Sequence, residues 1–279
     1  MKKSLSSTSV QLVVLVSLFA VLFSHTIIAL VKDWSTNPNY SHGFLIPIIA
    51  VFMIWQKREE ISPASFKPSN WGLVVIALGM MLHVVARLGA ELFTMRLAIV
   101  VTLFGLSVYF MGKEITRKTA IPIAYLLFMI PIPAILWNKI TFPLQIFSSR
   151  MAEEVIRFMG ISVLREGNIL RLTNATLEVV DACSGIRSLL SLLSLSAAFA
   201  YLSDHSRINK WVLFVSAIPI AILVNIIRLS LTAGLASYFG EKVAEGFLHE
   251  FSGVLIYILA LILLAGVHVI LLKMRRKSV

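Results

Sequence analysis

The chain alternates between long apolar runs and short polar segments. Apolar runs of about 18 residues or more, the length that a helix needs to cross the hydrocarbon core of a bilayer, recur from one end to the other. Their number predicts an all-α integral membrane protein with about eight transmembrane helices. The predicted spans lie near residues 10–31, 43–56, 71–88, 92–111, 119–137, 184–203, 210–232 and 252–273.

The first run resembles a secretory signal peptide, with Lys2 and Lys3 ahead of it. It is too long for one, however, and no small-residue cleavage site follows, so we expect it to be retained as the first helix. No internal repeat or appended soluble domain is visible. We therefore expect a single transmembrane domain over residues 1–279, with an extracytoplasmic insertion at about 138–183.

The insertion shows two further patterns. Residues 142–160 have helical periodicity, which predicts an amphipathic helix at the outer membrane interface. Its apolar stripe consists of Leu144, Phe147, Met151, Val155 and Phe158. Residues 161–182 alternate between apolar and polar positions around a Gly-Asn pair, which predicts a small β-hairpin. The hairpin would lead the chain directly into Cys183.

Composition and charge agree with this picture. The chain is 58% hydrophobic and only 14% charged, which excludes an ordinary soluble domain. The net charge of +11 does not indicate nucleic-acid binding, because the basic residues form short clusters between the apolar runs. Most of these clusters fall on one side of an eight-span topology. The positive-inside rule makes that side cytoplasmic and predicts that both termini are cytoplasmic.

Ionisable residues in or beside a membrane span are costly and often functional. Cys183, the one cysteine, begins the sixth span, Arg228 lies near the outer end of the seventh, and His249 precedes the eighth. The topology brings all three to the extracytoplasmic side. Asn225 shares a helix face with Arg228, and Arg187 lies one turn after Cys183.

These residue types suit acyl transfer by a cysteine nucleophile. A helix start and a nearby cation favour the thiolate, a histidine can act as base and then acid, and an arginine can hold an oxyanion. Each residue also has an ordinary explanation: small packing for Cys183, snorkelling for Arg228, a solvated loop for His249 and a helix N-cap for Asp181. The carboxylates and histidines lack metal-ligand spacing, so we expect no metal or cofactor.

Three stretches, "ACSGIRSLLSLLSLSAAFAYL", "NIIRLSLTAGLASYFG" and "GFLHEFSGVLIYILALILL", resemble the exosortase/archaeosortase family. "NYSHGFLIPIIAVFMIWQKR" is similar to an early motif of the same family. The resemblance implies that Cys183, Arg228 and His249 are catalytic. The histidine in third place points to the bacterial exosortase type, here without an additional C-terminal domain. Tyr40 and His42 are expected to line the site.

The resemblance also implies an activity and a location. Such a protein is a cysteine protease/transpeptidase of the bacterial cytoplasmic (inner) membrane. It cleaves secreted proteins that end in a Pro-Glu-Pro-type motif (PEP-CTERM-like), one transmembrane helix and a basic tail. Its partners would be these proteins, membrane lipid and an unknown acceptor molecule. Two other classes stay open: a transporter or flippase in polysaccharide export, whose polar site would lie near the midplane, and a structural scaffold.

Overall fold

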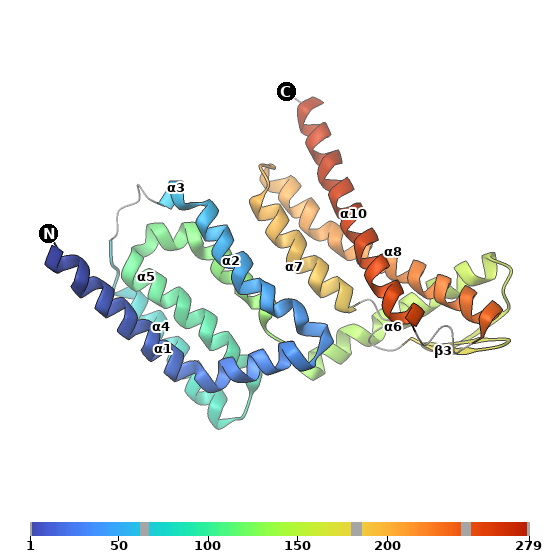
Figure 1. Cartoon of the computed structure of the whole chain (residues 1–279), viewed down its shortest axis with the longest axis horizontal. Coiled ribbons are helices and arrows are strands. Elements are labelled where there is room, and N and C mark those ends of the chain that lie inside the picture. Colours follow the sequence, from blue (N-terminus) through green and yellow to red (C-terminus); the bar gives the residue numbers. More distant parts are fainter. Residues whose placement is uncertain (1, 62–66, 180–185, 241–246, 278–279) are drawn as a thin grey trace. The chain divides into compact units, whose positions relative to one another are not determined.

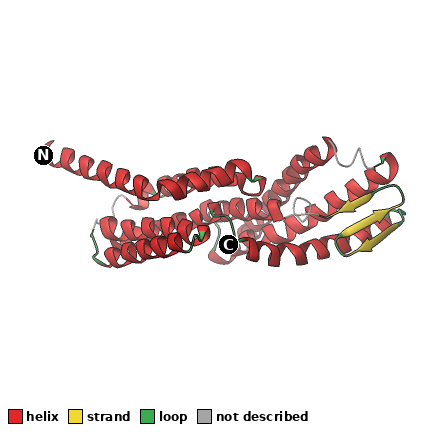
Figure 2. Cartoon of the chain, turned by 90° about the horizontal axis from the view of Figure 1, so that it is seen from below, coloured by secondary structure: helices red, strands yellow, loops and turns green. Residues whose placement is uncertain are grey.

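The structure is a computed structural model that describes residues 2–61, 67–179, 186–240 and 247–277. The described chain is helical apart from one small sheet (Figures 1 and 2). It divides into two compact units, Met1–Pro131 and Ile132–Val279, which are described separately.

The all-α membrane fold predicted from the sequence is confirmed. Six helical stretches of the described residues are long and apolar enough to cross a membrane. They are Val13–Thr36, Pro38–Gln56, Trp71–Leu88, Leu92–Met129, Arg207–Phe239 and Gly253–Met274. Two of the eight predicted spans are not separate helices among these six stretches. The span predicted at 119–137 falls partly within Leu92–Met129, and the one at 184–203 corresponds to a shorter apolar helix, Ile186–Leu202.

The first unit contains helices α1 to α5 and two 3₁₀ segments. Their bounds are α1 (Lys2–Thr36), η1 (Pro38–Phe44), α2 (Leu45–Gln56), α3 (Arg58–Ile61), α4 (Trp71–Leu88), α5 (Leu92–Tyr125) and η2 (Leu126–Met129). An ion pair of 2.6 Å between Arg96 and Asp33 joins α5 to the end of α1. Helix α5 is broken at Gly112 (φ 83°, ψ 171°), within the polar segment that was predicted to separate the fourth and fifth spans.

Glycines bring α4 and α5 into direct backbone contact. A Cβ on Gly105 would lie 2.8 Å from the backbone nitrogen of Ile76, and one on Gly72 would collide with the backbone of Tyr109. Small residues that allow such an approach are a usual basis of helix association in membranes, where lipid provides no hydrophobic drive. The α4–α5 contact therefore has no room for side chains at these positions.

The second unit contains the three residues proposed from the sequence as catalytic, Cys183, Arg228 and His249. It contains α6 (Ala134–Phe158), β1 (Val163–Glu166), β2 (Ile169–Leu172), β3 (Thr176–Glu178), α7 (Ile186–Leu202), α8 (Arg207–Phe239) and α10 (Phe247–Lys277). Helix α8 packs against α6, α7 and α10.

The predicted hairpin is confirmed and extended by a third strand. Strands β1 and β2 pair antiparallel across Gly167 and Asn168, and Gly167 adopts the left-handed φ of 66° that a tight turn requires. Strand β3 then pairs antiparallel with β2, giving the order β1-β2-β3. The second turn, at Thr173 and Asn174, lacks glycine, which is why the sequence pattern did not separate β3 from β2.

Helix α6 forms as predicted, but its apolar stripe faces away from the rest of the unit. Phe158 is 93% exposed and Phe147 is 45% exposed, whereas Ser149, Ala152 and Ile156 are fully buried. The sheet and α8 approach the side of the helix that carries small and polar residues, because these let neighbouring backbones come close. The exposed stripe suits a membrane interface, and the interfacial location stays a prediction.

Candidate active site

Arg228 lies between two separate hydrophobic cores of the second unit. One, which we call the bundle core, joins α7, α8 and α10 and includes Leu192, Val224 and Leu264. The other, the cap core, joins α6, the sheet and the C-terminal part of α8, and includes Ile156 and Leu229 among others. On α8, the buried residues of the bundle core end at Val224 and those of the cap core begin at Leu229.

The length of α8 explains this division. Its 33 residues extend for about 50 Å, well beyond the roughly 30 Å of a bilayer's hydrocarbon core. The predicted span of 210–232 is therefore shorter than the helix, and the outer part of α8 belongs to the cap core. Arg228 is half-buried, and Asn225, one turn earlier, is 3% exposed.

Arg228 extends to the backbone of α10. Its Nη2 atom lies 3.8 Å from the place that a Cβ on Gly253 would occupy. His249 lies in the first turn of α10, four residues before Gly253, so the two positions share a face of that helix. The side chain of His249 is outside the described part of the chain. Gly253 was not singled out from the sequence, and nothing in the sequence distinguishes it from Gly266 on the same helix.

The described part of helix α7 starts near the level of Arg228 on α8. The Ser196 hydroxyl lies 3.3 Å from the carbonyl oxygen of Phe214, which sets the register of these antiparallel neighbours. About ten residues further out along each helix, Ile186 comes level with Val224, roughly one turn from Arg228.

Cys183 and Asp181 lie outside the described residues, but both flanks of their segment are described. On one side, the Val179 N–H donates to the Asn168 carbonyl at 2.8 Å, and the Asn168 side-chain amide donates back to the Val179 carbonyl at 3.3 Å. On the other side, Ile186 is 2% exposed at the described start of α7. Both ends of the segment are thus anchored within the second unit.

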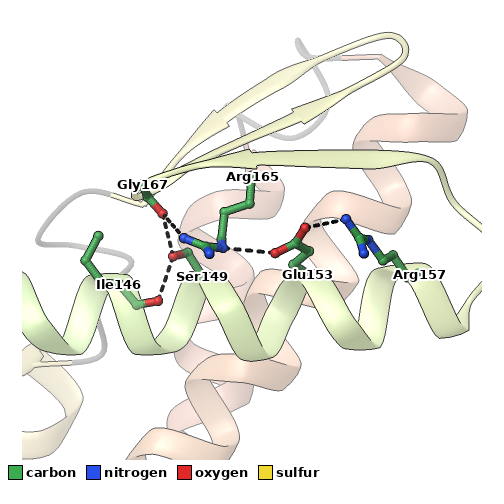
Figure 3. A network of polar contacts seen from close by, with 6 residues as sticks. All are labelled: Ile146, Ser149, Glu153, Arg157, Arg165 and Gly167. Atoms are coloured by element: carbon green, nitrogen blue, oxygen red, sulfur yellow. Dashed lines mark hydrogen bonds and ion pairs between the residues drawn. The ribbon is translucent and has the colours of Figure 1, made fainter.

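A polar network fastens the sheet to α6 (Figure 3). The Glu153 carboxylate, with 11% of its side chain exposed, pairs with Arg157 at 2.7 Å and with Arg165 of β1 at 2.9 Å. The Ser149 hydroxyl and Arg165 Nη1 each lie 3.0 Å from the Gly167 carbonyl oxygen. None of these residues was singled out from the sequence, because the cross-link between Glu153 and Arg165 forms only when the sheet packs on α6.

The remaining predicted site residues are less closely placed. Arg187 is exposed in the first described turn of α7, and its place in the site stays a prediction. Tyr40 and His42 belong to the first unit, where Tyr40 is 6% exposed and the two rings lie 6.5 Å apart. Their place in the site stays a prediction. Within the described ranges, no group of three His, Cys, Asp or Glu side chains could hold a metal ion.

Comparison with known families gives one match. A family model described as "Transmembrane exosortase (Exosortase_EpsH)" matches residues 34–266. The match covers most of the chain, including all seven residues singled out from the sequence. Neither the curated proteins nor the solved structures gave a match.

Proposed function

We propose that this chain, which belongs to the transmembrane exosortase family, is a cysteine protease/transpeptidase that cleaves C-terminal sorting signals of secreted proteins. Its substrates would end in a Pro-Glu-Pro-type motif, one transmembrane helix and a basic tail. Cleavage would take place on the extracytoplasmic side of the bacterial cytoplasmic membrane. The observation that carries the proposal is the place of Arg228 beside Gly253, which lies one turn after His249 in α10. Arg228 also lies roughly one turn from the level at which the described part of α7 starts.

Chain connectivity supports Cys183 as the nucleophile. Cys183 is three residues before Ile186, so their Cα atoms are at most about 11 Å apart. Arg228 is close to the level at which α7 begins. A thiolate, a cation and a histidine can therefore converge at the seam between the bundle core and the cap core.

The reaction would proceed through a thioester. The Cys183 thiolate attacks the scissile carbonyl carbon while His249 holds the thiol proton, and Arg228 stabilises the oxyanion that forms. His249 then protonates the leaving amine, which departs with the membrane helix and the basic tail. An acceptor amine or water attacks the thioester, returns a proton to His249 and releases Cys183.

The neighbouring polar residues would have supporting roles. Asn225, buried one turn from Arg228, would orient the arginine. Arg187 would either stabilise the thiolate or bind the glutamate of the motif. Tyr40 and His42 would line the substrate's path.

The single cysteine makes the test direct. We expect Cys183→Ala to abolish cleavage of a tagged substrate, measured by gel after co-expression, while Ser191→Ala on α7 leaves cleavage intact. A maleimide should label the native chain at Cys183 alone and inactivate it in proportion to labelling. Normal cleavage by Cys183→Ala would end the proposal.

A further inference from the structure

Strand β3 forms one edge of the sheet. Towards β2, the Leu172 N–H donates to the Ala175 carbonyl and the Val179 N–H to the Asn168 carbonyl, both at 2.8 Å. Along an antiparallel strand, the backbone N–H and C=O groups of successive residues point alternately towards and away from the paired strand. Those of Thr176 and Glu178 therefore point away from β2. Within the described ranges, no further strand pairs with this edge.

The two edges of the sheet have different surroundings. Strand β1, at the other edge, packs along α6, to which Arg165 is ion-paired. The side chains of Thr176 and Glu178 are exposed. The β2–β3 ladder continues to Val179, four residues before Cys183. A peptide laid along β3 would thus run beside the chain segment that leads to the proposed nucleophile.

We propose that the outer edge of β3 binds the recognition motif of the substrate as a fourth strand, an inference that rests on the proposed function. The backbone groups of Thr176 would hydrogen-bond to the central residue of the motif, and those of Glu178 to the chain beside the motif. Addition of an extended peptide to a sheet edge is a general mode of peptide recognition, in which main-chain hydrogen bonds provide the affinity.

The proline spacing of a Pro-Glu-Pro motif fits this mode. Proline has no N–H and is found in sheets at edges, where its nitrogen faces away from the ladder. Prolines two residues apart both present their nitrogens on the same side of a strand, and the residue between them presents its N–H and C=O on the other. The motif can therefore pair through its central residue while both prolines point outward, where they also prevent a further strand from adding.

The charged residues of the sheet favour one alignment of the motif along β3. Arg171 of β2 is directly opposite Thr176, whereas Glu178 is opposite Ile169. Directly paired residues have their side chains on the same face of the sheet. A motif glutamate beside Thr176 would lie in the same cross-strand row as Arg171, whose guanidinium also pairs with Glu166 at 2.7 Å, whereas one beside Glu178 would meet a second carboxylate directly. We therefore place the motif glutamate beside Thr176.

Proline substitutions test the edge hydrogen bonds. Thr176→Pro removes an N–H that points away from β2, so it should leave the β2–β3 pairing intact and lower cleavage about tenfold, the effect of one hydrogen bond. Thr176→Ala is the matched control, because it shortens the same exposed side chain but keeps the N–H. We expect it to cleave within about twofold of the native chain. Equal cleavage by two folded variants, judged by thermal unfolding, would overturn the inference.

Disulfide trapping tests binding independently of catalysis and of the proline substitutions. The Cys183→Ala chain has no cysteine, so Thr176→Cys in that background can cross-link only to a cysteine placed at the motif's glutamate. We expect a cross-link at Thr176 and none at Leu164, which lies in the same cross-strand row on β1. Equal trapping at both positions would overturn strand addition. Cleavage by Cys183→Ala would instead refute the proposed nucleophile, and trapping would still report where the motif binds.

Discussion

In the α4–α5 pair, glycine brings two helix backbones together, whereas in the α8–α10 pair it makes room for a side chain. A Cβ on Gly105 would lie 2.8 Å from a backbone nitrogen, which cannot yield. A Cβ on Gly253 would meet only the Arg228 guanidinium, at an ordinary contact distance of 3.8 Å. Glycine thus allows close backbone packing in the first unit, whereas in the second unit it leaves space beside the Arg228 guanidinium.

The largest effect should come from the α4–α5 contact. Gly105→Ala forces the helices apart, and we expect it to cost about 1–3 kcal/mol of folding free energy and to reduce the amount of folded protein. Gly266→Ala on α10 is the control, since no atom of the described residues lies within 4 Å of its Cβ position. Thermal unfolding in detergent measures both variants. Equal unfolding temperatures would show that the backbones separate without cost.

An enlarged side chain at Gly253 should separate activity from stability. Gly253→Leu displaces Arg228, so we expect cleavage to fall about tenfold or more at nearly normal stability, with the loss in kcat. Gly253→Ala should cleave within about twofold of the native chain, because its Cβ fits. Gly266→Leu controls for a leucine elsewhere on α10. Full activity in Gly253→Leu would remove this contact from the site.

The polar network that joins the sheet to α6 should have a smaller effect, confined to the cap core. Glu153→Gln leaves two partly exposed guanidinium groups beside a neutral amide, which we expect to destabilise the sheet by about 1 kcal/mol. Limited trypsin digestion should then cut at Arg165 and Arg171 sooner than in the native chain. Glu154→Gln changes the exposed neighbour and serves as the control. Equal digestion rates would show that the network does not hold the sheet.

The smallest effect concerns the N-cap of α5. Burial raises the pKa of Glu91, but hydrogen bonds from the Thr94 side chain and from the Thr94 and Phe93 N–H groups outweigh it, so the pKa is lowered overall. The resulting stability is present above the ordinary carboxyl pKa and is lost as the pH falls through the lowered value. Unfolding temperatures of the native chain and of Glu91→Gln should therefore converge in acid. A constant difference would contradict this.

The sequence predicts most of the fold because a long apolar run can adopt few structures in a bilayer. It also predicts Arg228 near the end of the seventh apolar run, although α8 continues beyond that run to Phe239. It could not predict which side of α6 faces inward, since Ser149 and Glu153 become good packing residues only when the sheet lies above them. Nor could it single out Gly253, because the value of that glycine depends on where Arg228 extends from another helix.

The length of α8 has a consequence for the lipid itself. From Arg207 at its start to Arg228, the helix rises about 31 Å, close to one hydrocarbon thickness. The stretch of α8 from Arg207 to Arg228 therefore has an arginine at each end and the length of one hydrocarbon core. Longer acyl chains would draw an arginine into the hydrocarbon, and shorter chains would leave it away from the surface. On the proposed function, the thickness of the surrounding bilayer would help to set the point at which a substrate is cut.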